Sequence, residues 1–92
     1  MALIFEWDPA KADENFKKHA VTFNEAASVF GDPLSVTFYD PDHSMNEHRF
    51  ITIGASNRGR PIMIAHTERG DSIRIISART ATRHERRFYE EA

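Results

Sequence analysis

The spacing of the apolar residues changes once along this chain of 92 residues, at the helix-breaking run Gly31-Asp32-Pro33. Before that run, apolar side chains recur at the helical spacing i, i+3, i+4 and i+7: Phe23, Ala26, Ala27 and Phe30. After it they alternate with a period of two, and β-branched residues are frequent. The chain is therefore expected to change from helices to a sheet. The predicted strands are Leu34–Tyr39, Arg49–Ser56, Arg60–Thr67 and Ser72–Ala78.

Capping signals indicate a helical hairpin before the strands. Asp8 followed by proline is an N-cap with proline at the first helical position, and it begins a helix over Pro9–His19. Thr22 and Glu25 have the spacing of a capping box, which opens the second helix after a short connection. The first helix offers only a narrow stripe for burial, formed by Ala12, Phe16 and Ala20 with Asn15 and His19 at its edge.

A second capping box, Thr82 with Glu85, opens a final helix at about Arg83. The opening residues "LIFEW" fit either a short strand or an extended arm. The polar segment Asp40–His48 is expected to be an exposed loop. The order is therefore two helices, four strands and one helix in a single domain, with the last three strands in an antiparallel meander.

The composition and charge place this domain in a broad class. A hydrophobic content of 40% with 28% charged residues is typical of a folded domain. The absence of cysteine excludes disulfides and thiolate metal sites. The start "MALIFEWDP" is unlike a signal peptide, and no apolar run is long enough to span a membrane, so we expect a cytoplasmic protein. From Arg58 onward eight arginines face five acidic residues, whereas residues 1–57 carry four basic and nine acidic residues.

The concentration of arginine in the last third favours a role with phosphates, because a guanidinium presents a planar fork of donors. Arg74 lies within an apolar strand run, where an unpaired charge is costly. Arg79 lies at the junction with the final helix, near amides that bind anions. The alternative is a solvated surface with salt pairs along the final helix, such as Arg86–Glu90 and Arg87–Glu91. We favour a polyanion, with RNA as the hypothesis.

Cleavage of RNA requires a base for the 2′-hydroxyl, an acid for the leaving 5′-oxygen and cations for the phosphorane. His66, at the end of the third strand, is a candidate base or acid, and its alternative is an ordinary polar residue at a strand end. Arg69 and Arg79 are candidates to hold the phosphate, and Tyr89 to donate a proton or stack. A regular hairpin places His66 opposite Ile73, so only a bulge in the turn would bring it together with Arg74.

We expect no metal ion and no cofactor. Acidic and histidine side chains gather in the polar loop, but no pair has helical ligand spacing: Asp40, Asp42, His43, Glu47 and His48. Lys18 and His19 are explained by the dipole at the end of the first helix, although they also fit the border of a substrate groove.

Three segments together resemble the BrnT family, toxins of type II toxin–antitoxin modules: "FEWDPAKADENFKKHAVTFNEAASVFGDP", "EHRFITIGAS" and "IRIISARTATRHERRFYE". The resemblance spans nearly the whole chain and implies one α+β toxin domain over residues 1–92, similar to RelE/ParE-like toxins. That fold has two N-terminal helices, a four-stranded antiparallel sheet and a C-terminal helix. The resemblance also implies a ribonuclease that inhibits translation, and a BrnA antitoxin whose ribbon-helix-helix dimer binds operator DNA with two toxins attached.

The resemblance also suggests residue roles. The family's functional arginines would fall on Arg79 and on Arg83 or Arg86, with help from the region His66–Arg69. The candidate catalytic residues are Arg79, Arg83, His66, Arg69 and Tyr89. The candidate RNA contacts are Arg74, Arg86, Arg58, Arg60, Lys18 and His19. One position departs from the family: Ala20 replaces a glycine that caps the helix in a left-handed conformation, at a cost of about 1 kcal/mol.

Three functions follow as hypotheses. The leading one is an endoribonuclease toxin that cleaves RNA without a metal through a 2′,3′-cyclic phosphate. The second is a non-catalytic co-repressor, whose arginines bind acidic side chains of an antitoxin that itself contacts DNA. The third, a stand-alone nucleic-acid-binding protein, is disfavoured by the net charge of −2 and the lack of a recognition-helix motif.

Overall fold

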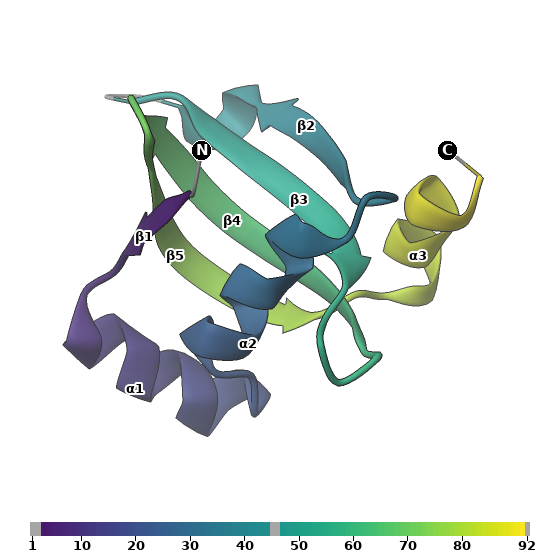
Figure 1. The fold of residues 1–92 in the computed structure, drawn as a ribbon, viewed down its shortest axis with the longest axis horizontal. Coiled ribbons are helices and arrows are strands. Elements are labelled where there is room, and N and C mark those ends of the chain that lie inside the picture. Colours follow the sequence, from purple (N-terminus) through teal and green to yellow (C-terminus); the bar gives the residue numbers. More distant parts are fainter. Residues whose placement is uncertain (1–2, 45–46, 92) are drawn as a thin grey trace.

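The structure is a computed structural model that describes residues 3–44 and 47–91. Met45 and Asn46 of the expected loop lie outside the described residues. The strands are β1 (Ile4–Glu6), β2 (Val36–Asp40), β3 (Arg49–Ala55), β4 (Pro61–Arg69) and β5 (Ser72–Thr80). The helices are α1 (Pro9–His19), α2 (Phe23–Ser28) and α3 (Arg83–Glu90), with short 3-10 turns η1 (Val29–Gly31) and η2 (Pro41–His43). Figure 1 shows the strands as one curved sheet, with α3 at one end.

The expected four-stranded antiparallel sheet is wrong in strand count and in direction. The sheet has five strands in the order β1-β5-β4-β3-β2, and β1 is parallel to β5. The opening residues therefore form a strand, with Phe5 opposite Ile73. The ring of Phe5 packs 5.4 Å from that of Phe30, so burial of this aromatic side chain helps hold β1 at the sheet edge. The other four strands are antiparallel, as expected.

The hairpin between β4 and β5 has a tighter turn than predicted. Arg69 pairs with Ser72 across the two-residue turn Gly70-Asp71, and Gly70 has a φ of +60° that favours glycine. His66 consequently pairs with Ile75, not with Ile73. The pairing of β4 with β5 does contain a register shift, but the shift lies between Ala65 and His66 and not in the turn. His66 and Arg74 therefore remain on opposite faces of the sheet.

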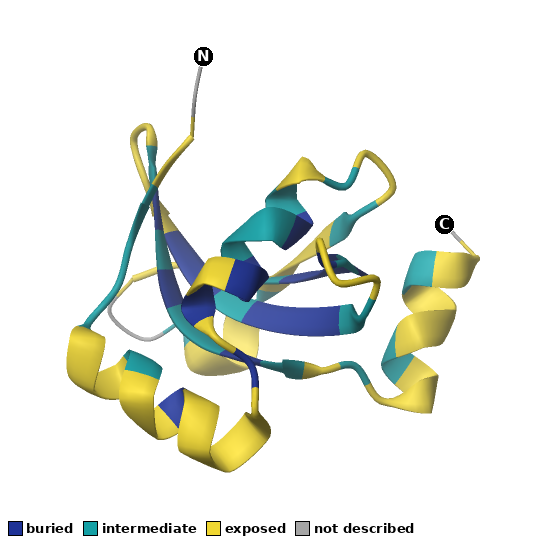
Figure 2. Cartoon of the chain, turned by 60° about the horizontal axis from the view of Figure 1, so that its bottom comes forward, coloured by how far each residue is buried: buried dark blue, intermediate teal, exposed yellow. Residues whose placement is uncertain are grey.

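Helices α1 and α2 pack against β5 and cover one face of the sheet, and Figure 2 shows the buried residues between them. The buried cluster joins α2 and its flanks to the sheet: Val21, Phe23, Ala26, Val29, Ile62, Ile64, Ile75 and Ala78. Gly54 allows η1 to approach β3 closely. A Cβ at this position would lie 2.8 Å from the Cβ of Ser35 and 2.9 Å from Cγ1 of Val29.

The predicted buried stripe of α1 is right at Ala12, which packs against the core, but wrong at Phe16. Asn15 is the buried residue of this helix, whereas the side chain of Phe16 is 52% exposed. The Asn15 amide donates to the carbonyls of Val21 (3.0 Å) and Ala78 (2.8 Å), and its oxygen accepts from the Ala78 N–H (3.0 Å). Because buried polar groups require partners, these three hydrogen bonds determine which side of α1 faces the sheet. Ala20 caps the helix at φ +56°, as the strain argument predicted.

The two predicted capping boxes have different outcomes. Thr82 and Glu85 form the complete box at the start of α3. At α2, Thr22 accepts from the Glu25 N–H, but the Glu25 carboxylate binds Arg60 and Ser56 instead of returning to the cap. Helix α2 is also shorter than the apolar pattern suggested, because its last turn tightens into η1.

Candidate functional site

The face of the sheet opposite α1 and α2 carries four arginines, and we call it the arginine face. Residues paired directly across strands share a face of the sheet. Ile62 and Ile64 point into the core, so Met63 between them points to the other face. Its cross-strand partners Ile53 and Arg79 share that face. Counting in steps of two from these pairs, with the register shift included, assigns four arginines to this face: Arg49, Arg69, Arg74 and Arg79.

A row of paired residues crosses the arginine face with one residue from each strand: Glu6, Arg74, Thr67, Arg49 and Asp40. At the centre of the row, Thr67 is 1% exposed, and its hydroxyl has no hydrogen-bond partner among the described residues. Arg49 and Arg74 flank it on the neighbouring strands. Sequence analysis missed Arg49 and Thr67, because their position depends on the register of three strands.

The ion pairs around this row are weak. Arg69 contacts Glu47 at 3.0 Å, and both Arg69 and Arg74 lie 3.8 Å from the same oxygen of Glu6. Partly exposed pairs of this kind contribute roughly 0–1 kcal/mol. Arg49 has no ion pair with any residue that the structure describes. These guanidinium groups can therefore exchange their present partners for phosphate at little cost.

Arg79 is held more firmly than the other arginines. Its two terminal nitrogens donate to the two carboxylate oxygens of Glu85, at 2.7 and 2.8 Å. This fork lowers the pKa of Glu85, so the carboxylate stays ionised. Glu85 also accepts from the Thr82 N–H. The pair thus ties the end of β5 to the start of α3, and an incoming phosphate must compete with Glu85 for this arginine.

Tyr89 also anchors α3. Its hydroxyl donates to Oδ2 of Asp32 at 2.7 Å, and the carboxylate beside it raises the pKa of Tyr89. Asp32 in turn accepts from the N–H groups of Leu34 and Ala55, and these hydrogen bonds lower the pKa of its carboxyl. The tyrosine proton is therefore committed to a protein partner in this conformation.

His66 lies in the core and not at the surface. It is 0% exposed, its Nε2 is 2.7 Å from the Thr52 hydroxyl, and the rings of Phe30 and Phe50 pack on it. Burial lowers the pKa of His66 to about 4, so the ring is neutral at neutral pH. RNA cannot contact a side chain enclosed in this way, and we leave His66 out of the site proposed below.

The remaining candidate RNA contacts fall into two groups. Arg60 donates to both oxygens of the buried Glu25 and to the Ala20 carbonyl, at the end of α1 that carries Lys18 and His19. Arg58 lies 3.8 Å from Glu25 as well. These residues gather beside α1 and α2. The candidate RNA contact Arg74 lies on the other face of the sheet, together with the candidate catalytic residues Arg69 and Arg79.

The arginines of α3 form the rest of the basic surface. Arg83 and Arg86 are exposed, and the expected pairs Arg86–Glu90 and Arg87–Glu91 do not form. The salt-paired alternative is therefore not supported for this helix. Arg86 lines a small pocket with Tyr89, beside the turn between β3 and β4.

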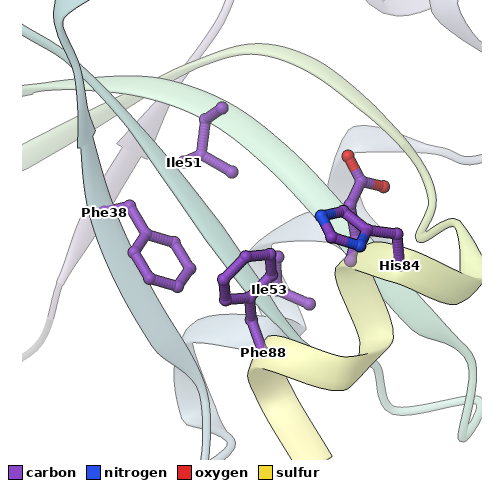
Figure 3. A pocket seen from close by; sticks show the side chains of 6 residues that line it. Phe38, Ile51, Ile53, His84 and Phe88 are labelled. Carbon is purple, nitrogen blue, oxygen red and sulfur yellow. The ribbon is translucent and has the colours of Figure 1, made fainter.

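An apolar groove lies between α3 and the arginine face, and sequence analysis missed it. Figure 3 shows Phe38, Ile51 and Ile53 projecting from the strands toward His84 and Phe88 of α3. Glu85 completes its wall. The rings of Phe38 and Phe88 meet edge to face with centroids 5.3 Å apart, yet they remain 39% and 47% exposed.

The described residues contain no group of three or more acidic or histidine side chains placed to hold a metal ion. Within the same residues, no helix has the length and apolar character needed to cross a membrane.

The fold and the site define a small α+β domain whose sheet presents arginines next to an arginine-bearing helix. Residues 7–85 match the family described as "Ribonuclease toxin, BrnT, of type II toxin-antitoxin system", and the chain belongs to this family. The crystal structure of the Brucella abortus ribonuclease toxin BrnT is similar, with a TM-score of 0.68 and 21% identity over 89% of this chain and 100% of that one. At this identity the likeness shows the fold alone. A comparison with curated proteins finds no match.

Proposed function

We propose that this protein is a metal-independent endoribonuclease of the cytoplasm that inhibits translation as the toxin of a type II module. Membership of the BrnT family supports the ribonuclease class. The observation that carries the proposal is the arginine face, where Arg49, Arg69 and Arg74 are unpaired or weakly paired. Such groups bind phosphate through charge-assisted hydrogen bonds.

In the proposed reaction the 2′-hydroxyl gives up its proton to a base as its oxygen attacks the adjacent phosphorus. The bond from phosphorus to the 5′-oxygen breaks, and the 5′-oxygen leaves with a proton. The products are a 2′,3′-cyclic phosphate and a free 5′-hydroxyl. Arg79 and Arg83, at the junction of β5 and α3, stabilise the negative charge of the phosphorane. His66 is buried and cannot transfer a proton to or from RNA. His84 takes this role, because the imidazole of His84 lines the groove between α3 and the arginine face.

The partner in this proposal is a BrnA-like ribbon-helix-helix antitoxin that neutralises the toxin, with two toxins on one antitoxin dimer. Operator DNA is contacted only through that antitoxin. Two observations support the alternative, a non-catalytic co-repressor. The guanidinium group of Arg79 is paired with Glu85, and the Tyr89 hydroxyl donates to Asp32. An activity measurement separates the two functions.

The test uses purified protein without antitoxin, incubated with RNA in the presence of EDTA. We expect cleavage with 2′,3′-cyclic phosphate ends, and we expect Arg83→Ala to reduce the rate by at least about tenfold, the scale on which lost charge stabilisation acts. Arg83 has no ion pair among the described residues, so this variant should keep the melting temperature of the parent. Arg58→Ala, beside α2, is the matched control. If the protein leaves the RNA uncleaved but still binds an antitoxin, the result would favour the co-repressor function.

A further inference from the structure

We propose that the apolar groove between α3 and the strands β2 and β3 binds one nucleobase of the RNA substrate. This inference rests on the proposed ribonuclease function and assigns to the site its base-recognition pocket. The groove is formed by Phe38, Ile51, Ile53, His84, Glu85 and Phe88. Its occupant is identified by three features: the shape of the walls, the neighbouring charge and a hydrogen-bond acceptor on Glu85.

The walls of the groove suit a flat aromatic ligand. Phe88 makes edge-to-face contacts with Phe38 and with His84, with centroids 5.3 Å apart in both pairs. Ile51 and Ile53 supply an aliphatic floor between the rings. Unpaired bases stack on aromatic side chains of this kind, and every base offers a face for such stacking. The groove is thus chemically matched to a base turned out of a single strand.

The position of the groove matches a ligand whose backbone is negatively charged. Ile53 in the floor pairs with Met63, and Met63 pairs with Arg79 on the same face of the sheet. From Arg79, strand β5 continues along this face to Arg74, beside Arg49 and Thr67. A strand of RNA whose phosphates follow these arginines can therefore lay a base against the exposed rings of Phe38 and Phe88.

Glu85 distinguishes a base from an apolar protein side chain. Its Oε1 accepts from Arg79 and from the Thr82 N–H, whereas its Oε2 accepts from Arg79 alone. Oε2 therefore keeps one position for a donor. A nucleobase can satisfy it, either through an amino group, as cytosine N4 does with carboxylates, or through a ring N–H. An apolar side chain of a protein partner would cover this oxygen without a hydrogen bond, which is costly.

Binding can be measured without cleavage by using an oligoribonucleotide that is 2′-O-methylated throughout, because the attacking hydroxyl is then blocked. A series of oligonucleotides carries an abasic unit at each position in turn. We expect one abasic position to weaken binding about 5- to 150-fold, the range for loss of one stacked base.

Phe88→Ala should weaken binding of the 2′-O-methylated oligonucleotide that has no abasic unit by a similar factor. It should also remove the difference in affinity between the oligonucleotides with and without the abasic unit. Phe88→Trp should restore that difference. Phe16→Ala is the matched control, because Phe16 is an equally exposed phenylalanine on α1 that lines a different pocket. Thermal unfolding of each variant checks that the fold is retained.

Two results would overturn the inference while leaving the ribonuclease proposal intact. One is binding by the parent protein that no abasic position weakens. The other is a Phe88→Ala protein that binds and cleaves RNA like the parent but loses affinity for an antitoxin, which would make the groove a protein-docking surface. Failure of the parent to bind any RNA would instead contradict the proposed function itself.

Discussion

At residue 20 the backbone adopts a left-handed conformation, with φ +56°, and the residue is alanine. Glycine adopts this conformation without a steric penalty, so Ala20→Gly should stabilise the protein by about 1 kcal/mol. Ala12→Gly is the matched control, because it makes the same exchange inside α1 and should destabilise by about 1 kcal/mol. Urea denaturation of both variants measures the effects. Destabilisation by Ala20→Gly would contradict the strain argument.

His66 should make stability depend on pH. An unfolded histidine has a pKa near 6.5, whereas the buried ring has a pKa of about 4. Between these values the unfolded chain binds a proton that the folded protein does not. The free energy of unfolding is therefore highest above pH 6.5, and it falls by up to about 3 kcal/mol as the pH is lowered toward 4.

The pH effect is measured by urea denaturation across this range. His66→Gln should flatten the profile whatever its stability at neutral pH, whereas His84→Gln, at an exposed site on α3, should leave the parent's slope unchanged. An identical slope in the parent and in His66→Gln would show that another group titrates.

At the scale of elements, local signals predicted what depends on neighbouring residues. The caps at Asp8, Thr22 and Thr82 begin helices where expected, and the period of two locates β2 to β5 within a few residues. Contacts between distant residues were not predictable. The face of α1 depends on Asn15 reaching Ala78, and the row across the arginine face depends on the length of one turn. Pattern alone cannot resolve a one-residue change in register.

Helix α3 depends on two polar contacts, and the bond from Tyr89 to Asp32 is the one that can be removed cleanly. Tyr89→Phe deletes only the hydroxyl, so we expect a loss of about 1 kcal/mol, below the usual value for a bond to a charged group because the site is partly exposed. The loss should be local. Hydrogen exchange should accelerate in α3 while β4 and β5 stay protected.

Tyr39→Phe provides the control for Tyr89→Phe. It deletes a hydroxyl that contacts His48, on the side of the molecule away from α3. This variant should leave hydrogen exchange in α3 unchanged. Equal acceleration in both variants, or slow exchange in α3 of Tyr89→Phe, would show that the Asp32 contact does not hold the helix.

At the scale of the whole molecule, the net charge of −2 hides a separation of basic groups into two regions. One surrounds Glu25 beside α1 and α2, where Arg60 satisfies a buried carboxylate. The other is the arginine face with α3. The first region has a structural task, because Glu25 would be costly to bury without its partner. In the second region Arg49, Arg69 and Arg74 are unpaired or weakly paired, and this is therefore the surface that we expect to follow an RNA backbone.

This division predicts the salt dependence of RNA binding. For a single strand, the logarithm of affinity falls with the logarithm of salt concentration by about 0.7 per phosphate contact. Arg74→Ala and Arg49→Ala should each reduce the slope by about that amount, and their effects should add. Arg58→Ala, which removes a 3.8 Å contact to Glu25 on the other side of the sheet, should leave the slope unchanged. Titrations of a 2′-O-methylated oligonucleotide over a series of KCl concentrations measure all three. A slope that falls for Arg58→Ala but not for Arg74→Ala would place the RNA beside α1 and α2, along Arg60, Lys18 and His19.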